Sequence, residues 1–243
     1  MSISYSSTKQ QQRQESQPDG KAALPPLHWT PTGLVETAYV TTNEVRQLEE
    51  RREASHAESA PLGLFGFAVG TLVASMVISG WYPTGAMVAI IPAVFVFAGL
   101  AQFIAGLLSF NRGSTFGGTT FCSYGAGNII VATFIWMQHA GLIPVTAANE
   151  AMLGIGLFCF AYISLMLCFA ALRANVAYAL TIAALVPGYA LAAVPMVGGN
   201  ALVGHVGGWF LAAAAVLAFY AGGAVVVNSN WRREALPLGN LMK

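Results

Sequence analysis

Six apolar stretches, each about 20 residues long, follow one another after a polar N-terminal segment. A helix needs about 20 apolar residues to cross a bilayer, so each stretch predicts one transmembrane helix. The breaks between them carry turn-forming residues, as in Gly80–Gly85 and Asn111–Gly113. The sequence therefore predicts an all-α membrane protein. The expected spans are Leu62–Ser79, Ala86–Leu108, Thr119–Gln138, Ala151–Ala171, Val176–Pro195 and Leu202–Val227.

The polar residues outside these stretches divide the chain into three parts. Residues 1–58 are rich in Ser, Gln and charged residues. Such a composition cannot bury enough apolar surface to order itself, so we expect a largely disordered cytosolic tail. Residues 59–230 are the expected transmembrane domain, and residues 231–243 are a second, short cytosolic tail.

Basic residues indicate how the chain is oriented in the membrane. Lys and Arg precede the first span and follow the sixth, and Arg112 and Arg173 lie in the loops after the second and fourth spans. The loops after the first, third and fifth spans contain neither residue type. Because cytosolic loops carry the excess of basic residues, both termini are predicted to lie in the cytosol.

Composition supports the membrane assignment and argues against catalysis. The chain is 56% hydrophobic and only 9% charged, whereas a soluble domain has about 25% charged residues. Between Pro61 and Asn228 the charged residues are Arg112, Glu150 and Arg173. The pattern contains no nucleophile–base pair, zinc-ligand spacing or phosphate-binding loop. We therefore expect no enzyme activity, no metal site and no cofactor.

Uncharged hydrogen-bonding side chains lie within the predicted spans, at depths where lipid offers them no partner. Gln102, Ser123, Tyr124 and Asn128 belong to the second and third spans, and Thr71 belongs to the first. Such groups pair with a neighbouring helix or line a watery passage, and the sequence leaves both readings open. A passage without buried ions suits a small weak acid better than a multiply charged solute.

Several short motifs together resemble the acetate uptake transporter family, which includes bacterial succinate–acetate permeases and yeast acetate carriers. The matching segments are Ser59–Phe67, the stretch around Ala98–Gln102, Gly113–Gly117, Phe121–Gly125 and the closing motif Leu236–Gly239. The resemblance implies six helices assembled as a ring-shaped homohexamer in the plasma membrane. It also implies passage of acetate and related short monocarboxylates, with succinate as a further candidate, by proton symport or through a channel.

The resemblance assigns roles to individual residues. Phe67, Tyr124 and Leu185 match the side chains that narrow the family's pore, and Gln102 matches a glutamine of its second span. Ala218 matches a small residue of the sixth span that influences which acids pass. In this reading Thr71, Gln102, Ser123 and Asn128 offer hydrogen bonds near the constriction.

The chain also departs from the family pattern. Glu58-Ser59 replaces Asn-Pro, Ser109 replaces a glutamate, Ser114 replaces an asparagine, and Gly127-Asn128 replaces Phe-Trp. The missing glutamate weakens any account of proton coupling taken from the family. Gly127-Asn128 exchanges two bulky rings for space and an amide next to Tyr124, so substrate preference is open to change.

Two other functions remain compatible with the sequence. One is passage of a different small molecule, such as ammonia. The other is a membrane protein that does not transport and signals acid stress through its long tail. Labelled-acetate flux in liposomes distinguishes these hypotheses from acetate transport.

Overall fold

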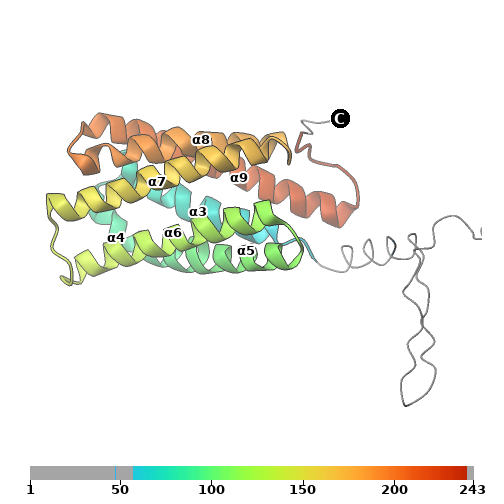
Figure 1. The fold of residues 1–243 in the computed structure, drawn as a ribbon, viewed down its shortest axis with the longest axis horizontal. Coiled ribbons are helices and arrows are strands. Elements are labelled where there is room, and N and C mark those ends of the chain that lie inside the picture. The colour runs from blue at the N-terminus through green and yellow to red at the C-terminus, as the bar shows by residue number, and fades with distance from the viewer. Residues whose placement is uncertain (1–46, 48–56, 240–243) are drawn as a thin grey trace, which may run out of the picture. The chain divides into compact units, whose positions relative to one another are not determined.

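The computed structural model describes residue 47 and residues 57–239, and in the second range it is a bundle of helices (Figure 1). Six of the described helical segments are long and apolar enough to cross a membrane, which confirms the six predicted spans. The predicted tail at residues 1–58 lies almost wholly outside the described residues. The elements are α3 (Ala60–Ile78), η1 (Thr84–Ala86), α4 (Met87–Pro92), η2 (Ala93–Ala101), α5 (Gln102–Asn111), α6 (Thr115–His139), α7 (Ala147–Ala171), α8 (Val176–Ala193), η3 (Pro195–Val197) and α9 (Ala201–Trp231).

Polar side chains fix where four of the long helices begin. At each start a side-chain oxygen accepts a hydrogen bond from a backbone N–H that has no partner within the helix. These caps explain why the helices begin directly after the polar loop residues. The capping residues and donors are Ser114 with Gly117 N (3.1 Å), Thr146 with Asn149 N (3.2 Å), Asn175 with Tyr178 N (2.8 Å) and Asn200 with Leu202 N (2.9 Å).

The second span is not a uniform α-helix. Pro92 ends α4, and the following segment η2 is π-helical before α5 resumes the α-helix at Gln102. Proline has no N–H to donate and crowds the preceding turn, so a local change of winding is expected beside it. The amide Nδ2 of Asn128 donates to the carbonyl of Ala98 within η2 at 3.3 Å. A neighbouring helix therefore supplies a partner for this segment's backbone.

Glycines allow the helices to approach closely around η2. A Cβ added to Gly66 of α3 would lie 2.6 Å from the carbonyl oxygen of Phe97, and one added to Gly125 of α6 would lie 2.7 Å from the backbone nitrogen of Phe103. Small residues at such contacts allow backbones to pack against each other in membranes. The second span is therefore held tightly between α3 and α6.

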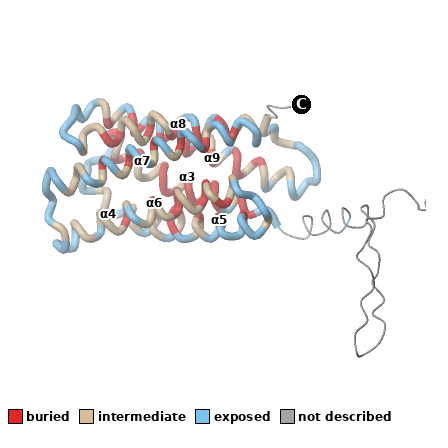
Figure 2. Tube along the Cα trace, viewed as in Figure 1, coloured by how far each residue is buried: buried red, intermediate tan, exposed pale blue. Residues whose placement is uncertain are grey.

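Buried residues gather along the centre of the bundle (Figure 2). Large apolar side chains are exposed on its outside. Ile130, Phe169 and Val216 are among the exposed ones. An apolar exterior of this extent is unfavourable in water and suits the hydrocarbon of a bilayer.

The residues after α9 fold back onto the start of α8. The backbone N–H groups of Val176 and Ala177 donate to the carbonyls of Gly239 (2.8 Å) and Leu238 (3.1 Å). The hydroxyl of Tyr220 donates to the carbonyl of Pro237 at 2.6 Å. The closing Leu-Pro-Leu-Gly motif thus ties the end of the chain to the bundle.

Asn228 is expected to hold this returning segment in place. Its Nδ2 donates to Leu236 O (2.7 Å), and its Oδ1 accepts from the backbone N–H groups of Ala235 and Leu236 (both 2.8 Å). Asn228→Ala removes all three bonds and should destabilise the protein by about 2 kcal/mol, lowering its melting temperature in detergent by roughly 4–8 °C. Asn230→Ala, an exposed change on the same helix end, is the control. Equal melting temperatures for the two variants would contradict this role.

Candidate functional site

Two cavities enter the bundle from opposite ends. We call them the Arg112 cavity, of about 120 Å³, and the Glu150 cavity, of about 640 Å³. The first is lined by residues from the start of α3, α6 and α8 and the end of α5. The second is lined by residues from the end of α3, the start of the second span, the ends of α6 and α8, and the start of α7. No described residue lines both cavities, so side chains separate them in the middle of the bundle.

A layer of four aromatic rings lies between the cavities. Phe67 and Tyr124 face the Arg112 cavity, and Tyr189 faces the Glu150 cavity. The ring centroids of Phe67 and Tyr124 are 5.9 Å apart, and those of Tyr124 and Tyr189 are 6.2 Å apart. Phe160 completes the layer, 6.0 Å from Tyr189 and 6.5 Å from Tyr124. These separations are those of packed aromatic pairs, and we call the four residues the aromatic layer.

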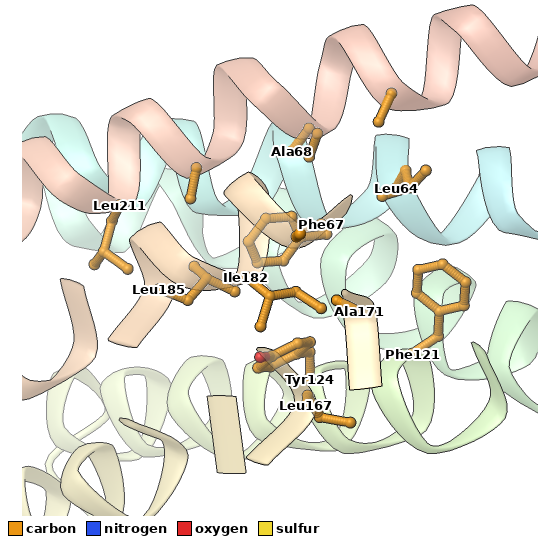
Figure 3. Packing of buried hydrophobic residues seen from close by; sticks show 14 of the residues in the cluster. Leu64, Phe67, Ala68, Phe121, Tyr124, Leu167, Ala171, Ile182, Leu185 and Leu211 are labelled. Carbon is orange, nitrogen blue, oxygen red and sulfur yellow. The ribbon is translucent and has the colours of Figure 1, made fainter. Parts of the chain in front are cut away.

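The three residues expected at the constriction come together in the core. Phe67 from α3, Tyr124 from α6 and Leu185 from α8 all belong to one cluster of buried side chains (Figure 3). All three line the inner part of the Arg112 cavity. Leu185 is only 1% exposed and is the largest of the fully buried side chains. Their role in narrowing a passage stays a prediction.

Hydrogen bonds fix the position of the Tyr124 ring. Its hydroxyl donates to the hydroxyl of Ser164 at 2.9 Å, and Ser164 donates to the carbonyl of Phe160 at 2.7 Å. Ser164 has no exposed surface. Because the hydroxyl of Tyr124 is hydrogen-bonded to α7, its aromatic ring faces the Arg112 cavity.

The predicted polar residues include a pair that contact each other beside this layer. Gln102, 1% exposed, lines the Arg112 cavity, and Asn128 lines the Glu150 cavity. The Asn128 amide donates to the Gln102 side-chain carbonyl at 3.4 Å. These two amides bond to each other across helices, and each also lines a cavity, so a role in lining a passage stays a prediction.

The other three expected residues differ in their placement. Thr71 lines the Glu150 cavity. Ser123 is half-buried and lines neither cavity. Ala218 has no exposed surface, lies in the same core cluster as Phe67, and is also absent from both linings. Any influence of Ala218 on selectivity would act through packing.

The ring of Phe160 packs against Gly127, at one of the departures from the family pattern. A Cβ at this position would collide with the ring of Phe160. In this chain the volume beside Tyr124 is therefore filled by a ring from α7. Phe160, Tyr189 and Ser164 were not singled out in the sequence, because aromatic residues and serines are common in apolar spans and only the fold brings these together.

The mouths of the two cavities differ in charge: the first holds an ion pair and the second holds a carboxylate. Arg112 Nη2 lies 3.7 Å from the carboxylate of Glu58 in the first, and Glu150 accepts a hydrogen bond from Gln138 Nε2 at 2.7 Å in the second. Between these mouths the described cavity linings contain no Asp, Glu, Lys or Arg. Within residues 57–239 no group of three His, Cys, Asp or Glu side chains is placed to hold a metal ion.

Residues 41–238 match the model of the GPR1/FUN34/yaaH family. The chain is 33% identical over 184 residues to the succinate-acetate/proton symporter SatP of Escherichia coli K12, covering 75% of this chain and 95% of that protein. It is 36% identical over 132 residues to acetate permease A of Emericella nidulans, covering 50% of this chain and 43% of the relative.

A solved structure shares the fold. The bacterial acetate channel SatP superposes with a TM-score of 0.71 at 30% sequence identity, covering 76% of this chain and 99% of that one. Together with the six apolar helices, these similarities make the chain an integral multi-pass membrane protein. The matched proteins named here are transporters or channels, consistent with the expectation of a non-enzyme.

Proposed function

We propose that this chain, which belongs to the GPR1/FUN34/yaaH family, carries acetate and related short monocarboxylates across a membrane. One observation carries the proposal: two cavities from opposite ends of the bundle stop on opposite faces of one aromatic layer. This arrangement supports a passage with a central constriction. The relatives named for acetate supply the substrate class.

The aromatic layer and Leu185 would act as an apolar gate. An ion or a large solute that enters it must lose its hydration shell against apolar side chains, at a high free-energy cost. A small monocarboxylate has one charge to dehydrate and a methyl group that suits the layer. Succinate has two charges, so the gate favours acetate over succinate.

The Gln102–Asn128 contact would lower the cost of crossing. Its two amides reach from one cavity lining to the other beside the rings. An amide both donates and accepts hydrogen bonds, so it replaces part of the water lost by a carboxylate. We expect the solute to pass between the rings and this amide pair.

The Arg112 end of the bundle would face the cytosol, because the basic residues lie at that end. In the proposed assembly six subunits form a ring in the plasma membrane, each with its own passage. Native mass spectrometry of the detergent-purified protein tests the subunit number. A mass other than that of six chains would overturn the hexamer without affecting the passage through one subunit.

Flux through liposomes separates this function from the alternatives. Vesicles containing the purified full chain are supplied with labelled acetate or labelled methylammonium at two pH values, with and without an imposed proton gradient. We expect saturable acetate flux and no methylammonium flux. Faster acetate uptake with the proton gradient indicates symport. An uptake rate that the gradient does not change indicates a channel. Methylammonium flux alone favours ammonia transport, and inert vesicles favour the signalling reading.

The charge at the outer mouth should control anion entry. Glu150→Gln keeps the length of the side chain and removes its negative charge, so an acetate anion meets less repulsion at the Glu150 cavity. We expect acetate influx at low ionic strength to rise about threefold, with a smaller effect at high salt. Glu234→Gln, an exposed charge change outside both cavity linings, is the control. Equal influx in the two variants would remove Glu150 from the entry path.

A further inference from the structure

The Arg112 cavity contains two buried hydrogen-bonding atoms that remain without a partner. They are Nη1 of Arg112 and Oγ1 of Thr120, and no described residue bonds to either. Arg112 is 25% exposed as a side chain, yet this nitrogen is buried. Thr120 is 7% exposed. Buried polar atoms nearly always have partners, so an unpaired one calls for an explanation.

The other serine and threonine hydroxyls that line the same cavity take part in hydrogen bonds. Ser109 donates to the carbonyl of Ala105 at 2.9 Å and lies 2.9 Å from the hydroxyl of Ser59. Ser114 caps α6. Thr181 donates to its own helix, at the carbonyl of Ala177 (2.8 Å). Thr120 also lies on a helix, but its hydroxyl makes no such bond with the described residues. It can therefore bond to a solute in the cavity.

The two unpaired groups lie at different depths. Arg112 follows α5 at the mouth of the cavity. Thr120 is five residues beyond Thr115, the first residue of α6, which places it about 7.5 Å further along the helix axis. Tyr124, one turn deeper on the same helix, lines the end of the cavity. A solute moving inwards therefore meets a charged donor, then a neutral donor, then the aromatic layer.

We propose that the Arg112 cavity is a binding site for a small carboxylate, received by the guanidinium of Arg112 at the mouth and by the hydroxyl of Thr120 deeper inside. A guanidinium only donates hydrogen bonds and is always charged, so it selects an anionic acceptor and excludes ammonium. The space of about 120 Å³ suits a solute of few atoms. This site deepens the proposed function and rests on it for the identity of the solute.

The carboxylate of Glu58 competes with the solute for the guanidinium of Arg112. Its carboxylate lies 3.7 Å from Arg112 Nη2, beyond hydrogen-bond distance, and its side chain is 49% exposed. An ion pair so exposed to water is weak. A solute carboxylate can therefore displace Glu58 from the guanidinium or bind beside it on Nη1. Glu58 keeps the cation partly neutralised when the site is empty.

Acetate binding to the purified full chain, measured by isothermal titration, tests the site. Arg112→Gln should raise the dissociation constant about tenfold, because it removes a hydrogen-bonded counter-charge. Thr120→Val should raise it about threefold. Glu58→Gln should lower it about threefold by removing the competitor. Arg173→Gln and Thr119→Val, at positions outside the cavity lining, are the matched controls and should bind as the wild type does.

Binding and flux distinguish failure of the site from failure of the proposed function. Unchanged affinity in folded Arg112→Gln and Thr120→Val proteins, with acetate flux intact in liposomes, overturns the site and leaves transport standing. Acetate binding that depends on Arg112 in a protein without flux supports the site and overturns transport. Weaker binding in Glu58→Gln would overturn the role of Glu58 as a competitor.

Discussion

Replacing Leu185 by alanine is expected to admit lactate, which we expect the wild type to exclude. Leu185 is 1% exposed and borders the Arg112 cavity beside Phe67 and Tyr124. Its truncation removes three carbon atoms where the two cavities approach each other, so a bulkier acid should fit between the rings. We expect lactate flux to rise from background to at least about one tenth of acetate flux, a change of more than 1 kcal/mol in relative barrier. Labelled lactate and acetate uptake in liposomes measures the ratio.

Loss of stability must be separated from widening of the gate in this experiment. A Leu→Ala change in a packed core costs about 2–5 kcal/mol. Leu167→Ala is the matched control, because Leu167 belongs to the same core cluster but lines neither cavity. Lactate flux in both variants would mean that general loosening, rather than Leu185, sets the selectivity. Unchanged selectivity in Leu185→Ala would remove Leu185 from the gate.

Gly127→Ala is expected to reduce acetate flux about tenfold. The added Cβ collides with the ring of Phe160, which must then shift, and its neighbours in the aromatic layer are Tyr124 and Tyr189. Overpacking of a tight site costs about 1–3 kcal/mol, and here the displaced ring narrows the passage. Initial acetate uptake rates, normalised to the amount of folded protein, measure the effect.

The chain offers a close control and a rescue for this change. Gly156 of α7 faces open space, with nothing within 4 Å of an added Cβ. Both substitutions improve helix propensity by about 1 kcal/mol, so only the collision differs between them. Gly156→Ala should transport as the wild type does, and adding Phe160→Ala to Gly127→Ala should restore flux. Equal rates for the two glycine variants would show that the position of Phe160 does not limit transport.

The helical bundle could be predicted from the sequence because long apolar stretches recur along the chain. Stretches of apolar residues such as Ala151–Ala171 have few alternatives to a membrane helix, and capping residues such as Asn175 mark where one begins. The π-helical form of the segment after Pro92 was not predicted. It depends on neighbouring helices, from which Asn128 donates to a carbonyl of this segment.

The candidate site was only partly predictable. Phe67 and Tyr124 were predicted from short motifs of glycine and aromatic residues that resemble those of the family. Tyr189 and Phe160 lie in helices full of similar residues, and their meeting depends on how α7 and α8 pack. The sequence also indicated a passage without buried ions. Arg112, at the start of the loop after α5, places a positive charge at the cavity mouth, and its Nη1 is buried there.

The initial rate of labelled acetate entry into liposomes at about pH 8, compared between vesicles with and without the full-length protein, tests the central claim most directly. Nearly all acetate is ionised at that pH, which lowers the fraction of neutral acid that can cross bare lipid. The two cavities and the aromatic layer predict a saturable rate far above that of protein-free vesicles. A rate equal to that of protein-free vesicles, from protein shown to be folded and inserted, would contradict it.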